Sequence, residues 1–230
     1  MSSPSLASWA NRYIQPHPEF AERLDCQSTV VDYDDLNSVR YALQGVDLLI
    51  STICGAEQLV LIDAARRARV RLFVPSEFEG AISHRPTGED ALDRGSAAAL
   101  EQLRHWAQSR THNMQYTVFS CGILYERFAP GGLSTYGMGT GSRIPNQGDY
   151  LVDVGNATAD IVEFDSRGQP VQVSMTSVGD LARFVAAAVE IGPGTWPREF
   201  KVRGDRMSVR EIVATCNRVR GSEFCATGGT

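Results

Sequence analysis

The chain has 230 residues, of which 43% are hydrophobic and 21% are charged, the composition of an ordinary soluble globular protein. This length allows one large domain, or one domain with a smaller lobe, and leaves enough residues for a packed core. No stretch reaches roughly 18 uninterrupted apolar residues, so we expect no membrane span. The net charge of −5, without a basic run, argues against nucleic acid as the main partner.

The N-terminal residues 1–18 lack the basic start and apolar run of a secretory signal. A cytosolic or nuclear location is therefore the default, and we expect a cytoplasmic protein. The five cysteines are an odd number and none has CxxC or Cys/His ligand spacing, so we expect neither a disulfide framework nor a metal site. Lys201 is the only lysine of the chain, which excludes any mechanism that needs a lysine elsewhere.

From Val30 onward, short apolar runs alternate with segments of helical periodicity, which is the pattern of an α/β fold. Four strands of one parallel sheet are predicted, at 28–32, 47–52, 71–75 and 116–120. Helices are predicted between them, one capped by Asp34 or Asp35 and ended by Gly45, one from Leu59 to Arg69, and one from Ser96 to Arg110. We expect these helices to cover both faces of the sheet.

The composition of the chain changes after Gly122. The segment 129–148 is rich in Gly, Ser and Pro and is interpreted as a long loop, and strands are predicted at 150–154 and 171–174. Two helices then begin at capping motifs, Ser177-x-x-Asp180 and Ser208-x-x-Glu211, and Gly221 ends the second one. We therefore expect a smaller lobe, built mainly from the chain after Gly122.

Several segments together resemble a known family. They are VDYDDLNSVRYALQGVDLLIST (31–52), LIDAARRARVRLFVPSEFEG (61–80), YTVFSCGILYERF (116–128), SMTSVGDLARFVAAAVE (174–190) and WPREFKVRGDRMSVREI (196–212). In this order they resemble the NmrA-like and isoflavone-reductase-like branch of the atypical short-chain dehydrogenases, in its fungal form. The resemblance covers roughly four-fifths of the chain, which is more specific than any single motif.

The resemblance implies a Rossmann-like, doubly wound parallel sheet that binds NAD or NADP. Residues 1–123 would form the NAD(P)-binding domain, and 124–230 a smaller C-terminal substrate lobe interwoven with it. Three functions stay open. The chain could be an oxidoreductase that passes hydride between NAD(P)H and a small aromatic or polyketide-like metabolite, a non-catalytic dinucleotide sensor or scaffold that binds a protein partner, or a truncated and inactive remnant.

The chain departs from the family pattern at its N-terminus. The family has a GxxGxxG turn after its first strand, which places the pyrophosphate at a helix N-terminus, and no such turn precedes Ser28. The first βαβ unit is therefore expected to be missing, and NAD cannot be distinguished from NADP. If the chain is complete, we expect weak or undetectable NADPH binding. Without the two central strands, we expect strand 28–32 to pair directly with strand 47–52 or this region to be partly disordered. The Gly137-x-Gly139-x-Gly141 run is interpreted as a flexible loop.

Six residues at the ends of predicted strands are candidates for cofactor binding. By the resemblance, Ser51 and Thr52 would line the adenosine and ribose side, and Pro75, Ser76, Glu77 and Phe78 would lie against the nicotinamide. Open α/β sheets place their ligands at the carboxyl ends of the strands. The structural alternatives are a strand end that satisfies its own backbone at Ser51 and Thr52, and a buried helix cap at Ser76 and Glu77.

The catalytic residue of the family is a lysine, and its position falls near Ser96 in this chain. The YxxxK pair of other short-chain dehydrogenases is excluded as well, because the residue four before Lys201 is Pro197. His84 could replace the lysine, since the pKa of histidine suits proton transfer near neutral pH, although a solvated loop histidine is the alternative. Tyr125 could donate a proton to a carbonyl substrate, with a packed aromatic side chain as the alternative.

Overall fold

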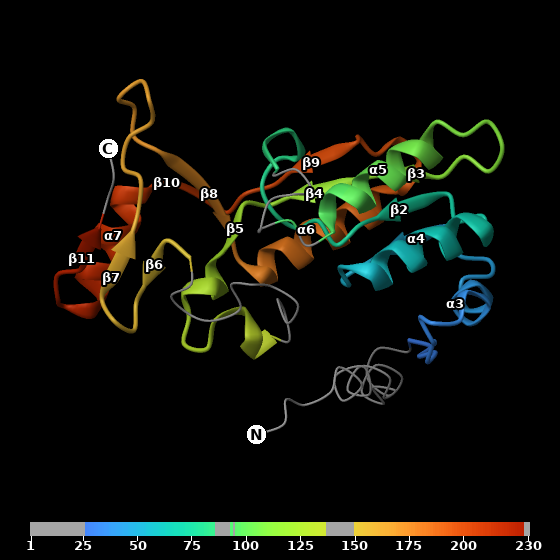
Figure 1. Ribbon diagram of the computed structural model, residues 1–230, viewed down its shortest axis with the longest axis horizontal. Helices are drawn as coiled ribbons and strands as arrows, with labels where there is room; N and C mark the ends of the chain where they lie inside the picture. The colour runs from blue at the N-terminus through green and yellow to red at the C-terminus, as the bar shows by residue number, and fades with distance from the viewer. Residues whose placement is uncertain (1–25, 86–92, 94, 137–149, 228–230) are drawn as a thin grey trace.

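The computed structural model describes residues 26–85, 93, 95–136 and 150–227 (Figure 1). The fold is α/β and Rossmann-like, with a parallel sheet at its centre. Strands β1 (Leu48–Ile50), β2 (Leu72–Val74) and β3 (Gln115–Tyr116) lie in this order and are parallel. All three residues of β2 are buried, as expected for a parallel strand that is covered on both faces.

One further strand extends this sheet from a distant part of the chain. After Thr117, the chain continues as β4 (Val118–Ser120), which pairs in parallel with β9 (Glu199–Lys201). The N–H of Thr117 still donates to Phe73, whereas the N–H of Val118 donates to Arg198. The predicted strand at 116–120 therefore changes its hydrogen-bonding partner in the middle, which divides it into two short strands.

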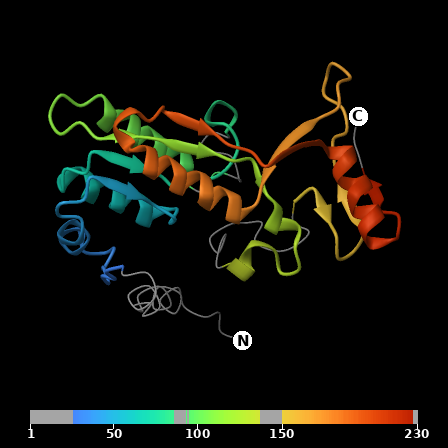
Figure 2. The same ribbon diagram turned by 180° about the vertical axis from the view of Figure 1, so that it is seen from behind.

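Helices cover both faces of the parallel sheet, as expected. The helices α3 (Leu36–Ala42), α4 (Ala56–Arg67) and α5 (Ser96–Ala107) pack against one face, around a core that includes Ile62, Phe73 and Leu103. Helix α6 (Val178–Ile191) covers the opposite face, where Leu181 and Ala188 belong to a core with Val74 and Phe119. Figure 2 shows α6 in front of the strands, with α4 and α5 behind them.

In the described part of the chain after Gly122, two further small sheets and the last helix pack around a third core. One sheet contains β10 (Asp205–Ser208), β8 (Gln172–Thr176) and β5 (Ile123–Leu124), and the other contains β11 (Cys225–Thr227), β7 (Thr158–Asp160) and β6 (Val152–Asp153). Helix α7 (Val209–Arg220) begins at the predicted capping box of Ser208 and Glu211. Short 3₁₀ helices also occur, at η1 (Ile82–His84), η2 (Tyr125–Phe128), η3 (Gly132–Tyr136) and η4 (Pro193–Thr195).

Gly122 stands where the chain leaves the parallel sheet. Its φ is +74°, and a Cβ atom at this position would lie 2.7 Å from the carbonyl carbon of Ser174 and still closer to its oxygen. Only glycine therefore allows the chain to pass this point, where β4 ends and β5 joins β8.

The prediction of a strand at 28–32 is wrong. Residues 26–32 adopt no helix or strand, Val30 is 48% exposed, and the expected pairing with 47–52 is not formed. A run of β-branched residues favours a strand only where a neighbouring strand accepts its hydrogen bonds, and no described strand does so here. Residues 137–149 of the predicted loop, with Gly137, Gly139 and Gly141, lie outside the described residues.

Candidate functional site

The candidate site is the edge of the parallel sheet where β1, β2 and β4 end. The chain leaves β1 through Ser51 and Thr52, and it leaves β2 through Pro75 and Ser76. The helices α4 and α5 both begin at this edge, because each follows the loop that leaves a parallel strand. The sheet thus gathers two strand ends and two helix N-termini in one place, which is where open α/β sheets bind their ligands.

Ser51 and Thr52 differ in what their side chains can reach. Ser51 is only 2% exposed, and its N–H donates to the carbonyl of Val74 at 2.8 Å. Its hydroxyl group donates to the carbonyl of Ile53 at 3.2 Å and accepts the N–H of Ile53 at 3.3 Å. Thr52 is exposed. At the end of β1, the Thr52 side chain is accessible to a ligand, while the Ser51 side chain satisfies the turn itself.

The segment that follows β2 is tied to the neighbouring helix and core. The N–H of Ser76 donates to Oε1 of Gln58 at 2.6 Å, and Gln58 is buried on α4. The ring of Phe78 lies 6.5 Å from the ring of Phe119 and packs in the second core. Pro75 is buried, whereas Ser76 is partly exposed. Ser76 is therefore the accessible residue at the end of β2.

Glu77 is held in a buried ion pair. Its carboxylate binds the guanidinium group of Arg85, and their side chains are 3% and 6% exposed. Arg85 also donates from Nη2 to the carbonyl of Glu77 at 2.6 Å and from Nε to the carbonyl of Gly80 at 3.0 Å. The hydroxyl group of Ser96, the first residue of α5, donates to the same Glu77 carboxylate. The carboxylate of Glu77 is thus linked to α5 through the hydroxyl group of Ser96.

A second carboxylate fixes the same loop to the far side of the sheet. Oε1 of Glu199 accepts the N–H of Ile82 at 3.0 Å and the hydroxyl of Ser120 at 2.5 Å. Although burial alone would raise the pKa of Glu199, these hydrogen bonds and Lys201, whose Nζ lies 3.7 Å from Oε2, hold the pKa below its usual value. Residues 76–85, called the 76–85 loop below, are thus anchored to β4 and β9.

The thiol of Cys121 is fully buried where the 76–85 loop meets β4. The N–H groups of Cys121 and Gly122 both donate to the carbonyl of Glu79, at 2.8 and 3.0 Å. Burial raises the pKa of the Cys121 thiol to about 11, so the thiol is protonated at neutral pH. Cys121 is consequently a packing residue and not a nucleophile.

The two candidate proton donors lie on different elements. His84 is exposed on η1, within the 76–85 loop. Tyr125 begins η2 and packs, partly buried, against the third core. Burial raises the pKa of its phenol, and the negative charges of Asp205 and Asp180 raise it further. The phenol is therefore protonated at neutral pH and is able to donate a proton.

The N-termini of α4 and α5 lie side by side. Each is preceded by a glycine, Gly55 with φ +78° and Gly95 with φ +82°, and neither glycine provides a side-chain cap. A Cβ atom at Gly95 would lie 3.4 Å from the Cα of Gly55. Carboxylates of the chain lie at both N-termini, since Oδ1 of Asp93 accepts the N–H of Ala97 at 3.0 Å and Oε2 of Glu57 lies 3.5 Å from the Cβ position of Gly55. The positive potential of the two N-termini is thus partly balanced within the protein.

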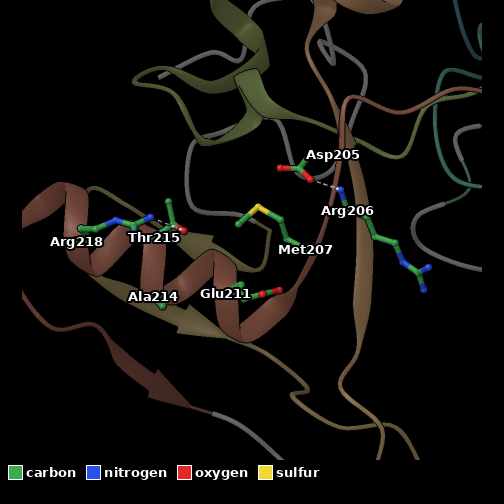
Figure 3. A pocket seen from close by; sticks show the side chains of 7 residues that line it. All are labelled: Asp205, Arg206, Met207, Glu211, Ala214, Thr215 and Arg218. Carbon is green, nitrogen blue, oxygen red and sulfur yellow. Dashed lines mark hydrogen bonds between the residues drawn. The ribbon is translucent and has the colours of Figure 1, made fainter.

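Other parts of the described chain are weaker candidates for a ligand site. A groove of about 410 Å³ lies between β10 and α7, and its lining side chains are Asp205, Arg206, Met207, Glu211, Ala214, Thr215 and Arg218 (Figure 3). Several of these groups bind within the protein, since Glu211 caps α7 and Asp205 accepts the N–H of Arg206 at 2.7 Å. The described residues contain no cluster of His, Cys, Asp or Glu that could hold a metal ion. They also contain no helix with the length and apolar character that a membrane crossing requires.

The fold of this chain is similar to that of several solved structures. No protein-family model and no curated protein matches the chain. The structures similar to it include the ternary complex of leucoanthocyanidin reductase from Vitis vinifera (TM-score 0.59, 14% identity, 86% of this chain and 62% of that one). The NADPH complex of the NADPH-dependent quinone oxidoreductase QOR2 from Escherichia coli is also similar (TM-score 0.58, 18% identity, 94% and 68%). A third is a nucleoside-diphosphate-sugar epimerase from Staphylococcus aureus (TM-score 0.56, 16% identity, 87% and 63%).

At these identities the likeness shows the fold alone, which is Rossmann-like. The chain spans 62% of the length of leucoanthocyanidin reductase.

Proposed function

We propose that this chain is an NAD(P)H-dependent oxidoreductase that acts on a small aromatic or polyketide-like metabolite. The observation that carries the proposal is the carboxyl edge of the sheet, where Thr52, Ser76 and the glycine-capped N-termini of α4 and α5 lie together. The similar structures of leucoanthocyanidin reductase and of QOR2, both with NADPH complexes, support the same class. The sequence resemblance to the NmrA-like and isoflavone-reductase-like proteins supplies the expected substrate class.

The described residues fit one part of a dinucleotide. Thr52 offers an exposed hydroxyl group and Ser76 a partly exposed one, beside the N-termini of α4 and α5. Only the backbone N–H groups of these first turns that are not bound within the protein could bind an anionic group, because Asp93 already accepts the N–H of Ala97. NAD(P)H, when bound, supplies the hydride. A glycine-rich turn that follows a parallel strand is not present among the described residues, so we expect the chain to bind NADPH with a Kd on the order of 100 µM, corresponding to roughly 5 kcal/mol.

The reduction of a carbonyl group also needs a proton for the product oxygen. The resemblance places a lysine near Ser96, and the hydroxyl group of Ser96 is bound to the buried Glu77 carboxylate. Tyr125 and His84 are the two side chains that we propose for this proton transfer. The protonated phenol of Tyr125 suits a donor, and the exposed imidazole of His84 suits exchange with solvent.

A second function is favoured by the absence of a lysine near Ser96. Without a general acid at this position, the chain would bind a dinucleotide and pass the signal to a protein partner. This non-catalytic regulator shares the carboxyl edge with the reductase, and the two functions differ only in turnover.

The test is a titration of the purified chain with NADPH and NADH, followed by oxidation assays with quinones and aromatic ketones. If the chain is a reductase, it should bind NADPH and oxidise it in the presence of a substrate. Thr52→Arg places a large side chain at the carboxyl edge of the sheet and should weaken the binding of NADPH. Val219→Arg, at a side chain that is 81% exposed on α7, is the matched control and should leave binding unchanged. Binding without oxidation of any substrate would favour the regulator, and the absence of binding would overturn both.

A further inference from the structure

The groove between β10 and α7 results from the way in which the chain passes from a strand to a helix. Strand β10 ends at Ser208 and α7 begins at Val209, so the strand and the helix diverge from one point and form the two walls of the groove. Its volume of about 410 Å³ lies within the range of small-molecule sites. In Figure 1 this part of the chain lies away from α4 and α5, so the groove is separate from the carboxyl edge of the sheet.

The helical wall of the groove is the side of α7 that faces away from the third core. The residues of α7 that pack in this core are Val209, Ile212, Val213 and Cys216. The residues of α7 that line the groove are Glu211, Ala214, Thr215 and Arg218. Each groove residue follows a core residue by two positions, which is a rotation of about 200° around the helix. The groove residues therefore form a continuous face of their own, with i, i+3, i+4, i+7 spacing.

The other wall of the groove is set by the alternation of side chains along β10. Asp205 and Met207 lie on one side of the strand and Arg206 on the other. Figure 3 shows the side chains of Asp205 and Met207 on the side of α7, whereas that of Arg206 points away from the helix. The thioether of Met207 thus provides an apolar surface within the groove, and the methyl group of Ala214 adds to it from α7.

Arg218 brings a positive charge to the groove that is not balanced within the described chain. Its Nη2 lies 3.5 Å from the hydroxyl of Thr215, and it forms no ion pair with a described carboxylate. The nearby carboxylate of Glu211 is bound instead by the N–H and the hydroxyl of Ser208, at 2.7 and 2.8 Å. The guanidinium group of Arg218 is therefore able to donate two parallel hydrogen bonds to a carboxylate of a ligand.

We propose that this groove binds a small aromatic carboxylate, with its carboxylate group on Arg218 and its ring on Met207 and Ala214. Asp205, on the opposite wall, repels the carboxylate of the ligand and accepts a hydroxyl group, which sets the orientation of the molecule. The negative charges of Asp205 and Glu211 also disfavour a nucleotide, because its several phosphate charges would be repelled. The inference goes beyond the proposed function and does not depend on it.

The experiment is an NMR titration of the full chain with 4-hydroxyphenylacetate and with its uncharged analogue 4-hydroxyphenylacetamide. The acid should shift the amide signals of β10 and α7 and bind about tenfold more tightly than the amide, because only the acid forms a charge-assisted hydrogen bond with Arg218. Arg218→Gln should reduce the affinity for the acid about tenfold and leave the affinity for the amide unchanged. Arg210→Gln is the matched control, since Arg210 is exposed on the same helix and does not line the groove.

A second variant tests the groove without removal of Arg218. Ala214→Glu places a new carboxylate four residues before Arg218, where the two side chains form an i, i+4 ion pair. The new side chain also occupies part of the groove. Because Ala214 is exposed, the fold should tolerate this change, and the binding of 4-hydroxyphenylacetate should fall about tenfold or more.

Several results would overturn the inference. They are the absence of binding of the acid, equal affinities of the wild type for the acid and the amide, and equal affinities of the wild type and Arg218→Gln for the acid. Signal shifts that lie outside β10 and α7 would contradict the position of the site.

Discussion

The two sides of the parallel sheet are stabilised in different ways. On the β1 side, Leu48 and Leu49 pack against the helices, Ile50 is 36% exposed, and β2 is the only described strand that pairs with β1. On the β4 and β9 side, the 76–85 loop adds the ion pair of Glu77 and the hydrogen bonds of Glu199. Apolar burial thus determines the layers of the fold, while polar networks determine the geometry at the carboxyl edge.

The largest difference between the two sides is expected for truncation of an apolar side chain. Phe119 on β4 is 1% exposed and contacts the rings of Phe78, Trp196 and Phe200. Phe119→Ala should lower the free energy of unfolding by about 3–5 kcal/mol, because it leaves a cavity between the sheet and α6. Ile50→Ala on β1 should cost about 1 kcal/mol, since part of that side chain is already in water. Urea unfolding measures the free energy of unfolding of both variants. Equal losses in the two variants would contradict the difference between the two sides of the sheet.

A smaller loss is expected where β4 leaves the sheet. Gly122→Ala adds a Cβ atom against the backbone of Ser174 and should cost about 2–4 kcal/mol. Gly45→Ala is the matched control, because Gly45 also has a positive φ of +78° but has open space around its Cβ position. This control should cost about 1 kcal/mol. Thermal unfolding of the two variants gives their losses of unfolding free energy, and the difference between these losses is the steric cost at Gly122. Similar losses for both variants would show that the junction at Gly122 is not tightly packed.

The helix cap of α7 is expected to contribute less. Ser208→Ala removes the hydrogen bonds that the Ser208 side chain makes with Glu211 and should cost about 1 kcal/mol. Hydrogen bonds from the backbone and side chain of Ser208 hold the pKa of Glu211 below its usual value. A depressed pKa stabilises the fold above the unfolded pKa, and this contribution is lost as the pH falls below about 4. Between about pH 7 and pH 3, the free energy of unfolding should therefore fall less in Ser208→Ala than in the wild type. The same fall in both proteins would contradict the contribution of the cap.

The smallest effect concerns the reactivity of a thiol. With a pKa of about 11, Cys121 should resist alkylation by iodoacetamide in the native chain, whereas the exposed Cys225 should react. Since the folded pKa is raised, stability should decline as the pH rises from about 8.5, the usual value for a thiol, towards the folded value. Peptide mass spectrometry identifies the alkylated residues, and rapid modification of Cys121 would show that the β4 side opens easily.

The sequence predicted the parts of the fold that depend on local patterns. The apolar run at 71–75 became β2, and the capping motifs at Ser177 and Ser208 became the starts of α6 and α7. The run at 28–32 is also β-branched, but a strand needs a partner as well, which a local pattern does not reveal. The division of 116–120 into β3 and β4 depends on β9, some 80 residues further along the chain, for the same reason.

The predicted cofactor-binding residues differ in their contacts, and their role in cofactor binding stays a prediction. Thr52 and Ser76 are accessible at the strand ends, whereas Ser51 and Glu77 are buried and bound to groups of the protein. Arg85 was not identified, because an arginine in a polar loop resembles a solvated residue. The signal that could have identified it is Glu77 itself, since a carboxylate directly after a buried strand needs a cation nearby.

Amide hydrogen exchange of the chain, with and without NADPH, tests most directly where the nucleotide binds. Without the ligand, the amide of Thr117, which donates to Phe73, should exchange slowly and that of Ile50 quickly. With NADPH, protection should rise in the first turns of α4 and α5 and in the 76–85 loop. Unchanged exchange at these positions, or new protection confined to the groove between β10 and α7, would contradict a nucleotide site at the carboxyl edge.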